Sequence, residues 1–181
     1  GAYARLIEQG KVRHIGASNH NAAQPGSALA ASRRLGLPRY ETVQPLYNLY
    51  DRNVFEGELA ALCARESVGV ISYYALASGF LTGKYRDEAD IAASARARSN
   101  SKYLNPRGLR ILAALDSVAA SYGVKPGQVA IAWLVAQPAL TAPIASATTI
   151  AQLDELIAAT KLSLAPQALA ELDAASAETD A

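Results

Sequence analysis

The stretch Val12-Arg-His-Ile-Gly-Ala-Ser-Asn19, followed by the alanine-rich segment 22–35, sets the pattern that decides the fold. The first part predicts a short β-strand over residues 12–16, and the second has the length and composition of a helix. Gly36 and Pro38 follow, as glycine and proline commonly do just past a helix end. Residues 12–35 therefore predict one unit of a β-strand and an α-helix.

Helices and short apolar strands alternate along the rest of the chain. This alternation is typical of βα units around a parallel sheet, so we expect an α/β fold. A connection over residues 75–108, rich in Ser, Arg, Asn and Gly, is long enough to predict a functional or mobile loop. Further strands are predicted at 42–44, 68–73 and 140–144, and helices at 3–10, 55–63, 112–122, 126–138, from Thr149 and from Pro166.

The alternation alone leaves two architectures open, a doubly wound open sheet and a closed (β/α) barrel. No Gly-x-Gly-x-x-Gly follows a predicted strand, which counts against the dinucleotide-binding open sheet. A complete barrel needs eight strands and about 250 residues. With 181 residues and four predicted strands, the chain looks like half of a larger fold. Two edge strands and one apolar sheet face would then stay uncovered.

Composition narrows the class of protein further. The chain is 51% hydrophobic and 18% charged, with a net charge of +1, which predicts a globular protein and gives no support for binding nucleic acid or an anionic membrane. It has neither an apolar run of membrane-spanning length nor a signal peptide, so a cytoplasmic location is expected. The single Cys63 fits a reducing compartment and is expected to be a buried hydrophobe. Methionine is absent even at position 1, so we expect a truncated or processed chain.

Four sequence blocks cover nearly the whole chain. They are Gly10-Lys-Val-Arg-His-Ile-Gly-Ala-Ser-Asn19, then Gln44-Pro-Leu-Tyr-Asn48 with Arg52 and Glu58, then Tyr73-Tyr-Ala-Leu-Ala-Ser-Gly-Phe-Leu-Thr-Gly-Lys-Tyr85, and finally Val129-Ala-Ile-Ala-Trp-Leu134 with Ala142-Pro-Ile144. In this order they resemble the motifs around strands five to eight of the aldo-keto reductase family.

The resemblance implies a parallel (β/α) barrel of the TIM type, of which residues 1–181 would be the C-terminal half, with the N-terminal half missing. It implies NAD(P)H-dependent reduction of aldehydes or ketones to alcohols, this chain supplying the cofactor-binding half. The partners implied are a small carbonyl substrate and either the missing half-barrel or a second copy. The alternatives are a regulatory cofactor-binding subunit, similar to potassium-channel β subunits, and an inactive fragment.

The resemblance also implies which residues hold the cofactor. Residues matching Ser18, Asn19 and Gln44 bind the nicotinamide carboxamide, which both donates and accepts hydrogen bonds. The residue matching Tyr73 stacks under the nicotinamide ring. The residues that match the loop over the pyrophosphate are Leu76, Ser78, Gly79, Leu81 and Lys84.

The segment that matches the adenosine site departs from the family pattern. Its implied contacts are Ser146, Thr148, Gln152 and Glu155. Thr148 stands where many members carry an arginine, which grips the 2′-phosphate of NADP through paired hydrogen bonds. NADP is therefore the expected cofactor and NAD the alternative.

Several of these residues have structural alternatives. Asn19 suits a helix cap as well as a cofactor contact, and Gln152 suits a capping box opened by Thr149. Gln44 and Tyr73 have the alternative of ordinary roles in a strand, and Lys84 that of a solvated lysine. The resemblance favours the cofactor for each.

The family's catalytic Asp, Tyr, Lys and His would all lie upstream of Gly1, so we expect no catalytic residue within this chain. His14 is expected within a strand and His20 in an exposed loop, and neither matches the catalytic histidine. No metal-binding cluster is recognised. The isolated chain is therefore expected to be inactive.

Overall fold

The computed structural model describes residues 1–92 and 100–178, and every structural statement below concerns these residues. Their strands form one parallel sheet in the order β1-β2-β3-β4. A doubly wound sheet reverses its strand order at a switch point, whereas a barrel adds its strands in sequence. The predicted α/β class is confirmed, with the topology of one part of a barrel. The strands are β1 (Ile15–Ser18), β2 (Tyr40–Gln44), β3 (Gly69–Ser72) and β4 (Ala142–Pro143).

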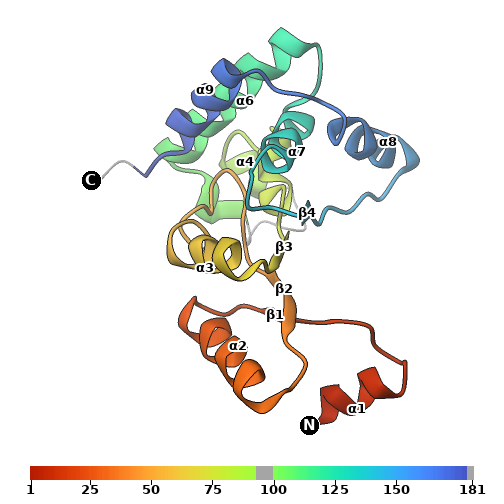
Figure 1. Ribbon diagram of the computed structural model, residues 1–181. Coiled ribbons are helices and arrows are strands. Elements are labelled where there is room, and N and C mark those ends of the chain that lie inside the picture. Colours follow the sequence, from red (N-terminus) through yellow and green to blue (C-terminus); the bar gives the residue numbers. More distant parts are fainter. Residues whose placement is uncertain (93–99, 179–181) are drawn as a thin grey trace.

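Helices connect these strands and extend beyond the last one. Figure 1 shows α1 and α2 at the β1 end of the sheet, with α6 to α9 at the β4 end. Proline begins α6, α7 and α9, where its missing N–H costs nothing. The helices are α1 (Ala2–Glu8), α2 (Ala23–Leu35), α3 (Glu58–Glu66), α4 (Glu88–Ala92), α6 (Pro106–Tyr122), α7 (Pro126–Val135), α8 (Ile150–Ala159) and α9 (Pro166–Ser176), with 3-10 turns η1 (Ala77–Thr82) and η2 (Ser101–Tyr103).

The first and last strands differ from their predicted bounds. The prediction of a strand over residues 12–16 is wrong in position, because pairing with β2 begins only at Ile15, opposite Tyr40. His14, expected within the strand, precedes it and is exposed. The strand predicted at 140–144 is reduced to Ala142–Pro143.

The described parts of the connection over residues 75–108 contain short helices. These parts carry η1, α4 and η2 where the sequence predicted a functional or mobile loop, while residues 93–99 lie outside the described residues. Phe80 and Leu81 are fully buried and Tyr103 nearly so. Burial of these side chains anchors the connection to the core.

The two faces of the sheet have different surroundings. Side chains on one face, which we call the covered face, are buried: Ala17, Val43, Val70 and Ser72. Side chains alternate between the faces of a strand, so the intervening residues share the opposite, open face. The open face carries Gly16, Ser18, Thr42, Gln44, Ile71 and Tyr73, all partly or fully exposed.

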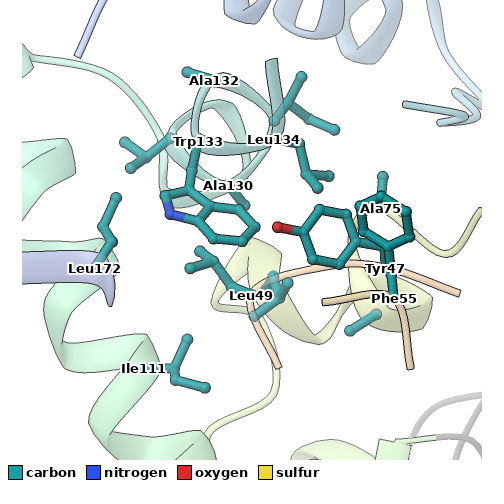
Figure 2. Packing of buried hydrophobic residues seen from close by; sticks show 14 of the residues in the cluster. Tyr47, Leu49, Phe55, Ala75, Ile111, Ala130, Ala132, Trp133, Leu134 and Leu172 are labelled. Atoms are coloured by element: carbon teal, nitrogen blue, oxygen red, sulfur yellow. The ribbon is translucent and has the colours of Figure 1, made fainter. Parts of the chain in front are cut away.

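The centre of the core lies around Trp133 of α7, which Figure 2 shows beside Tyr47, Leu49 and Leu172. Trp133 is fully buried, and its ring centroid lies 5.6 Å from that of Tyr47. Its indole Nε1 donates to Asp173 Oδ1 of α9 at 3.1 Å. The same carboxylate oxygen accepts from Arg52 at 2.8 Å. Trp133 thus connects α9, through Asp173, to the segment that follows β2, through Tyr47.

Cys63 lies in this core, as predicted for a small hydrophobe. Burial raises the pKa of its thiol. Among the described residues, no helix combines the length and hydrophobicity that crossing a membrane requires.

Candidate functional site

The predicted nicotinamide residues meet at one edge of the sheet. Ser18 ends β1 and pairs in register with Gln44, which ends β2, while Tyr73 directly follows β3. Ser18 Oγ donates to the Gln44 carbonyl at 3.0 Å, and the Tyr73 hydroxyl donates to Asn19 Oδ1 at 2.6 Å. Three strand ends are therefore linked by hydrogen bonds on the side where barrels bind their ligands.

Asn19 is not a helix cap in this structure. Its side chain accepts from Tyr73, and its backbone has a left-handed φ of 58°, which Asn tolerates better than most residues. The capping role belongs to Asn21, whose Oδ1 accepts from the Gln24 amide while Gln24 Oε1 accepts from the Asn21 amide. The capping alternative for Asn19 is therefore wrong, and its side chain is turned toward the predicted site.

The backbone after β3 is strained where it leaves the sheet. Tyr74, Ala77 and Ser78 have φ values of 57°, 47° and 57°, and Gly79 has 93°. Left-handed backbone is unfavourable for residues with a Cβ and concentrates at functional sites. The segment predicted to lie over the pyrophosphate thus has an unfavourable left-handed backbone conformation, which contacts with neighbouring residues must stabilise.

The residues predicted along the pyrophosphate lie in and beside η1. Leu76 and Ser78 are half-buried, whereas the Leu81 side chain is fully buried in the core, so Leu81 has only its backbone to offer a ligand. Lys84 lies against Gly79, because a Cβ at Gly79 would sit 3.1 Å from Lys84 Cε. The Lys84 ammonium is 4.9 Å from the centroid of the Tyr85 ring. The structure brings this lysine and glycine together.

An ion pair holds the end of this segment. The Arg86 guanidinium donates to both carboxylate oxygens of Asp116, at 2.7 and 2.8 Å, and to the Gly83 carbonyl at 2.7 Å. The hydrogen bonds to Asp116 raise the pKa of Arg86 despite partial burial. Paired bonds of this kind fix geometry as well as charge, so α6 supports the end of η1.

The predicted adenosine segment is held mainly by contacts within itself. Ser146 and Thr148 are exposed. Thr149 caps α8 by accepting from the Gln152 amide at 3.2 Å, which confirms the helix cap but only half of the predicted capping box, because the Gln152 side chain bonds to Thr148 and not to the Thr149 amide. Gln152 Oε1 accepts from the Thr148 amide and hydroxyl, at 2.8 and 3.0 Å. Any cofactor contact by Gln152 stays a prediction.

Glu155, the last predicted contact, forms an ion pair with Lys125 at the start of α7. Its backbone carbonyl accepts from Gln128 Nε2 at 3.3 Å. These contacts join α8 to α7, and they give Glu155 a structural role alongside the predicted one.

Asn48 is a residue for which the sequence predicted no role. It is fully buried, and its side chain bonds to Asp51, to two backbone amides and to the Tyr74 carbonyl. Its position just past a strand could have predicted the bonds to the Tyr50 and Asp51 amides, because Asn side chains in turns commonly bond to the backbone two or three residues ahead.

The two histidines are not among the predicted cofactor residues. His14 and His20 are both exposed, and His20 Nδ1 lies 2.5 Å from the Ser18 carbonyl oxygen. The described part of the chain holds no group of three or more His, Cys, Asp or Glu residues arranged for a metal ion.

Comparison with known proteins agrees with the resemblance. The model of the Aldo/keto reductase family matches residues 1–177. Protein Tas of Escherichia coli strain K12 is 33% identical over 175 residues, 96% of this chain and 50% of that protein. A probable voltage-gated potassium channel subunit beta of Arabidopsis thaliana is 34% identical over 83% of this chain and 47% of that protein.

A third relative is the aldo-keto reductase yakc [NADP(+)] of Schizosaccharomyces pombe, 26% identical over 95% of this chain and 50% of that protein. The chain spans about half the length of the relatives it matches. With a family match over nearly all residues and strands added in barrel order, the chain belongs to the aldo/keto reductase family.

Proposed function

We propose that this chain supplies the cofactor-binding half of an oxidoreductase that reduces aldehydes or ketones to alcohols with NAD(P)H. The observation that carries the proposal is the convergence of Ser18, Asn19, Gln44 and Tyr73 at one sheet edge, with Tyr73 bonded to Asn19 at 2.6 Å. Barrel enzymes build their sites at this end of the strands. We assign the protein to the cytoplasm, where a single unpaired cysteine is usual.

The residues present fit a nicotinamide. A carboxamide needs both donors and acceptors, which Ser18, Asn19 and Gln44 offer. Because Asn19 Oδ1 accepts from Tyr73, Asn19 would hold the carboxamide oxygen through its NH2 group. The half-buried Tyr73 ring on the open face would support the flat ring. When bound, a reduced nicotinamide supplies the hydride that is added to the carbonyl carbon.

The residues around η1 fit a pyrophosphate. Gly79 leaves room for Lys84 to lie across it, so a cation and the backbone of the turn sit close together. Backbone amides in strained turns suit phosphate oxygens, and Lys84 would add positive charge. Thr148 would contact the far end of the cofactor with a hydroxyl in place of a guanidinium. NADP therefore remains the proposed cofactor, with a smaller preference over NAD than an arginine would give.

The proposal includes a partner for the open face. The edge strands β1 and β4 each have one unpaired side in the described sheet. Ile150, Leu153 and Ile157 of α8 are 80%, 49% and 47% exposed and share one side of that helix. A second half-barrel, from a longer chain or from another copy, would cover these surfaces and supply the catalytic Asp, Tyr, Lys and His. The carbonyl substrate would bind between the two halves.

A regulatory role is the second candidate. The Arabidopsis relative named as a potassium channel subunit beta is 34% identical to this chain. A regulatory subunit would bind the cofactor without needing fast turnover. The two candidates differ in one measurable property, the rate of cofactor oxidation in the presence of carbonyl compounds.

The test follows NADPH and NADH in the presence of a panel of aldehydes and ketones. The 181-residue chain is expected to bind NADPH without oxidising it. The same chain expressed with its upstream coding sequence is expected to oxidise NADPH. Turnover by the isolated chain would contradict the assignment of catalysis to the other half. Failure to bind either nucleotide would contradict the cofactor assignment, and tight binding without turnover in the longer protein would favour the regulatory candidate.

A further inference from the structure

The loop over residues 47–51, which we call the anchor loop, contacts both ends of the connection that carries the predicted pyrophosphate residues. At the start of the connection, Asn48 Nδ2 donates to the Tyr74 carbonyl at 3.1 Å. Near its end, Asp51 accepts from the Tyr103 hydroxyl at 2.8 Å and from Lys102 Nζ at 3.2 Å. One short loop therefore holds both ends of a connection about thirty residues long.

Asn48 uses its whole side-chain amide in these contacts. Its Oδ1 accepts from the Tyr50 and Asp51 amides at 2.8 and 2.9 Å. Its Nδ2 donates to Asp51 Oδ2 and to the Tyr74 carbonyl, both at 3.1 Å. A fully buried amide with every group paired has a fixed orientation, because any rotation would leave a buried donor or acceptor unsatisfied.

The contact with Tyr74 falls where the chain turns sharply away from the sheet. Tyr74 has a φ of 57°, which is unfavourable for an aromatic residue, so its neighbours must hold this conformation. Its carbonyl accepts from Ala77 N at 2.8 Å as well as from Asn48. Tyr73, one residue earlier, is bonded through its backbone to Pro45 and Tyr47. The backbone of Tyr73 is therefore held by the sheet on one side and adjoins the Tyr74 turn on the other.

We propose that Asn48 is a positioning residue for the nicotinamide end of the cofactor site. By donating to the Tyr74 carbonyl, it fixes the turn after β3, and so sets the Tyr73 ring and the bond from its hydroxyl to Asn19. Asn48 acts through Tyr73 and is buried away from the cofactor itself. The inference rests on the proposed function, because it gives Asn48 a role in the same nucleotide site.

A pair of variants separates this role from general stability. Asp51→Asn alone keeps the donation from Asn48 to Tyr74 but removes the charge that faces Lys102 and Tyr103. Adding Asn48→Asp exchanges the two side chains, so the carboxylate then at position 48 still accepts from the loop amides and from the new amide at position 51. Position 48 then no longer donates to the Tyr74 carbonyl, because a carboxylate has no N–H group. The two variants thus share the loss of the Asp51 charge, while the second also loses the donation to Tyr74 and places a carboxylate at position 48. The uncharged variant Asn48→Ser, described below, separates these two differences.

The readout is the dissociation constant of the 181-residue chain for two ligands, NADPH and 2′-phospho-ADP-ribose, which lacks the nicotinamide. The double variant is expected to bind NADPH about tenfold more weakly than Asp51→Asn, the size of one lost buried hydrogen bond. Its affinity for 2′-phospho-ADP-ribose should stay within about threefold, because the hydrogen bond that the variant removes serves the nicotinamide end. Urea unfolding of each variant gives the folded fraction to which the affinities refer.

A double-mutant cycle tests whether Asn48 acts through Tyr73. When Tyr73→Leu is added to both variants, the further change Asn48→Asp is expected to alter NADPH affinity by less than about twofold, because the ring that Asn48 positions is gone. Asn48→Ser provides a second variant, since its hydroxyl accepts from the loop amides but is too short to reach Tyr74.

Four results would overturn the proposal. The first is NADPH affinity equal to that of Asp51→Asn in both Asn48 variants. The second is an equal loss for both ligands, and the third is an undiminished loss in the Tyr73→Leu background. The fourth is that neither Asn48 variant folds, which would make Asn48 a requirement of the fold. If the unsubstituted chain binds neither ligand, the proposed function itself fails, and that outcome is distinct from the other four.

Discussion

The covered and open faces of the sheet differ although the same strands build both. Val70 and Ile71 are neighbours in β3, yet Val70 is fully buried under the helices while Ile71 is only half-buried on the open face. On β2, Val43 points to the core and Gln44 to the predicted nicotinamide site. Alternation along a strand therefore separates residues that stabilise the fold from residues available for binding.

The largest expected effect lies in the core against which the covered face packs, at Trp133 of α7. Trp133→Ala should lower the free energy of unfolding by about 3–5 kcal/mol, because a fully buried ring is replaced by a cavity. Ile150→Ala, at a position 80% exposed, is the control and should cost less than about 0.5 kcal/mol. Urea denaturation of both variants measures the difference. A loss below about 1 kcal/mol for Trp133→Ala would mean that the core is not centred there.

The comparison between the faces is sharpest at two adjacent residues. Val70→Ala should cost about 2 kcal/mol of unfolding free energy, because its side chain is fully buried. Ile71→Ala should cost less than about 1 kcal/mol, although it removes more carbon atoms. Urea unfolding of the two variants decides the matter, and equal costs would show that both faces are packed in solution.

Two buried tyrosines predict a pH dependence. Burial, reinforced by hydrogen bonds to Glu56 and Asp51, raises the pKa values of Tyr47 and Tyr103 well above the ordinary 10.0. In the unfolded chain both phenols lose their protons near about pH 10, while the folded chain keeps them. The free energy of unfolding should therefore be insensitive to these groups below about pH 10 and fall as the pH rises above it.

The matched control is the double variant Tyr47→Phe and Tyr103→Phe. It should show a shallower decline between about pH 10 and about pH 11.5 in urea titrations, because neither phenol remains to ionise. An unchanged slope would assign the alkaline decline to other groups.

The smallest expected effect is on the open face. Tyr73→Phe keeps the aromatic ring but removes the bond to Asn19, so NADPH affinity should fall by about threefold to tenfold with little change in stability. Tyr74→Phe, at the exposed neighbouring ring, should leave the affinity unchanged. Fluorescence titration of both variants makes the comparison, and a larger loss for Tyr74→Phe would move the site away from Tyr73.

The repeating parts of the fold were predictable from local pattern. Alternating apolar segments indicated the parallel sheet, and Gly36 and Gly123 end their helices in left-handed conformations as expected. The start of β1 was not predictable, because it depends on pairing with Tyr40, a residue distant in sequence. Phe80, Leu81 and Tyr103 anchor the described parts of the 75–108 connection to the core, which composition alone does not reveal.

The candidate site was predictable in its residues but not in its internal contacts. Resemblance named Asn19 and Tyr73 separately, whereas their hydrogen bond depends on how β1 and β3 flank β2. Asn21 took the capping role that Asn19 could have served, and only the geometry distinguishes these nearby asparagines. Asn48 went unrecognised because its partner at position 74 is distant in sequence.

The most direct test of the central claim is an NMR titration of the isotope-labelled 181-residue chain with NADP⁺, following backbone amide shifts. The claim predicts the largest changes at Ser18, Asn19, Gln44 and Tyr73, at the binding edge of the open face, with smaller ones at η1. Amides at covered-face residues such as Val43 and Val70 should change least. Shifts concentrated on the covered face or on α9, or no shift at saturating nucleotide, would contradict the assignment of this sheet edge as the nicotinamide site.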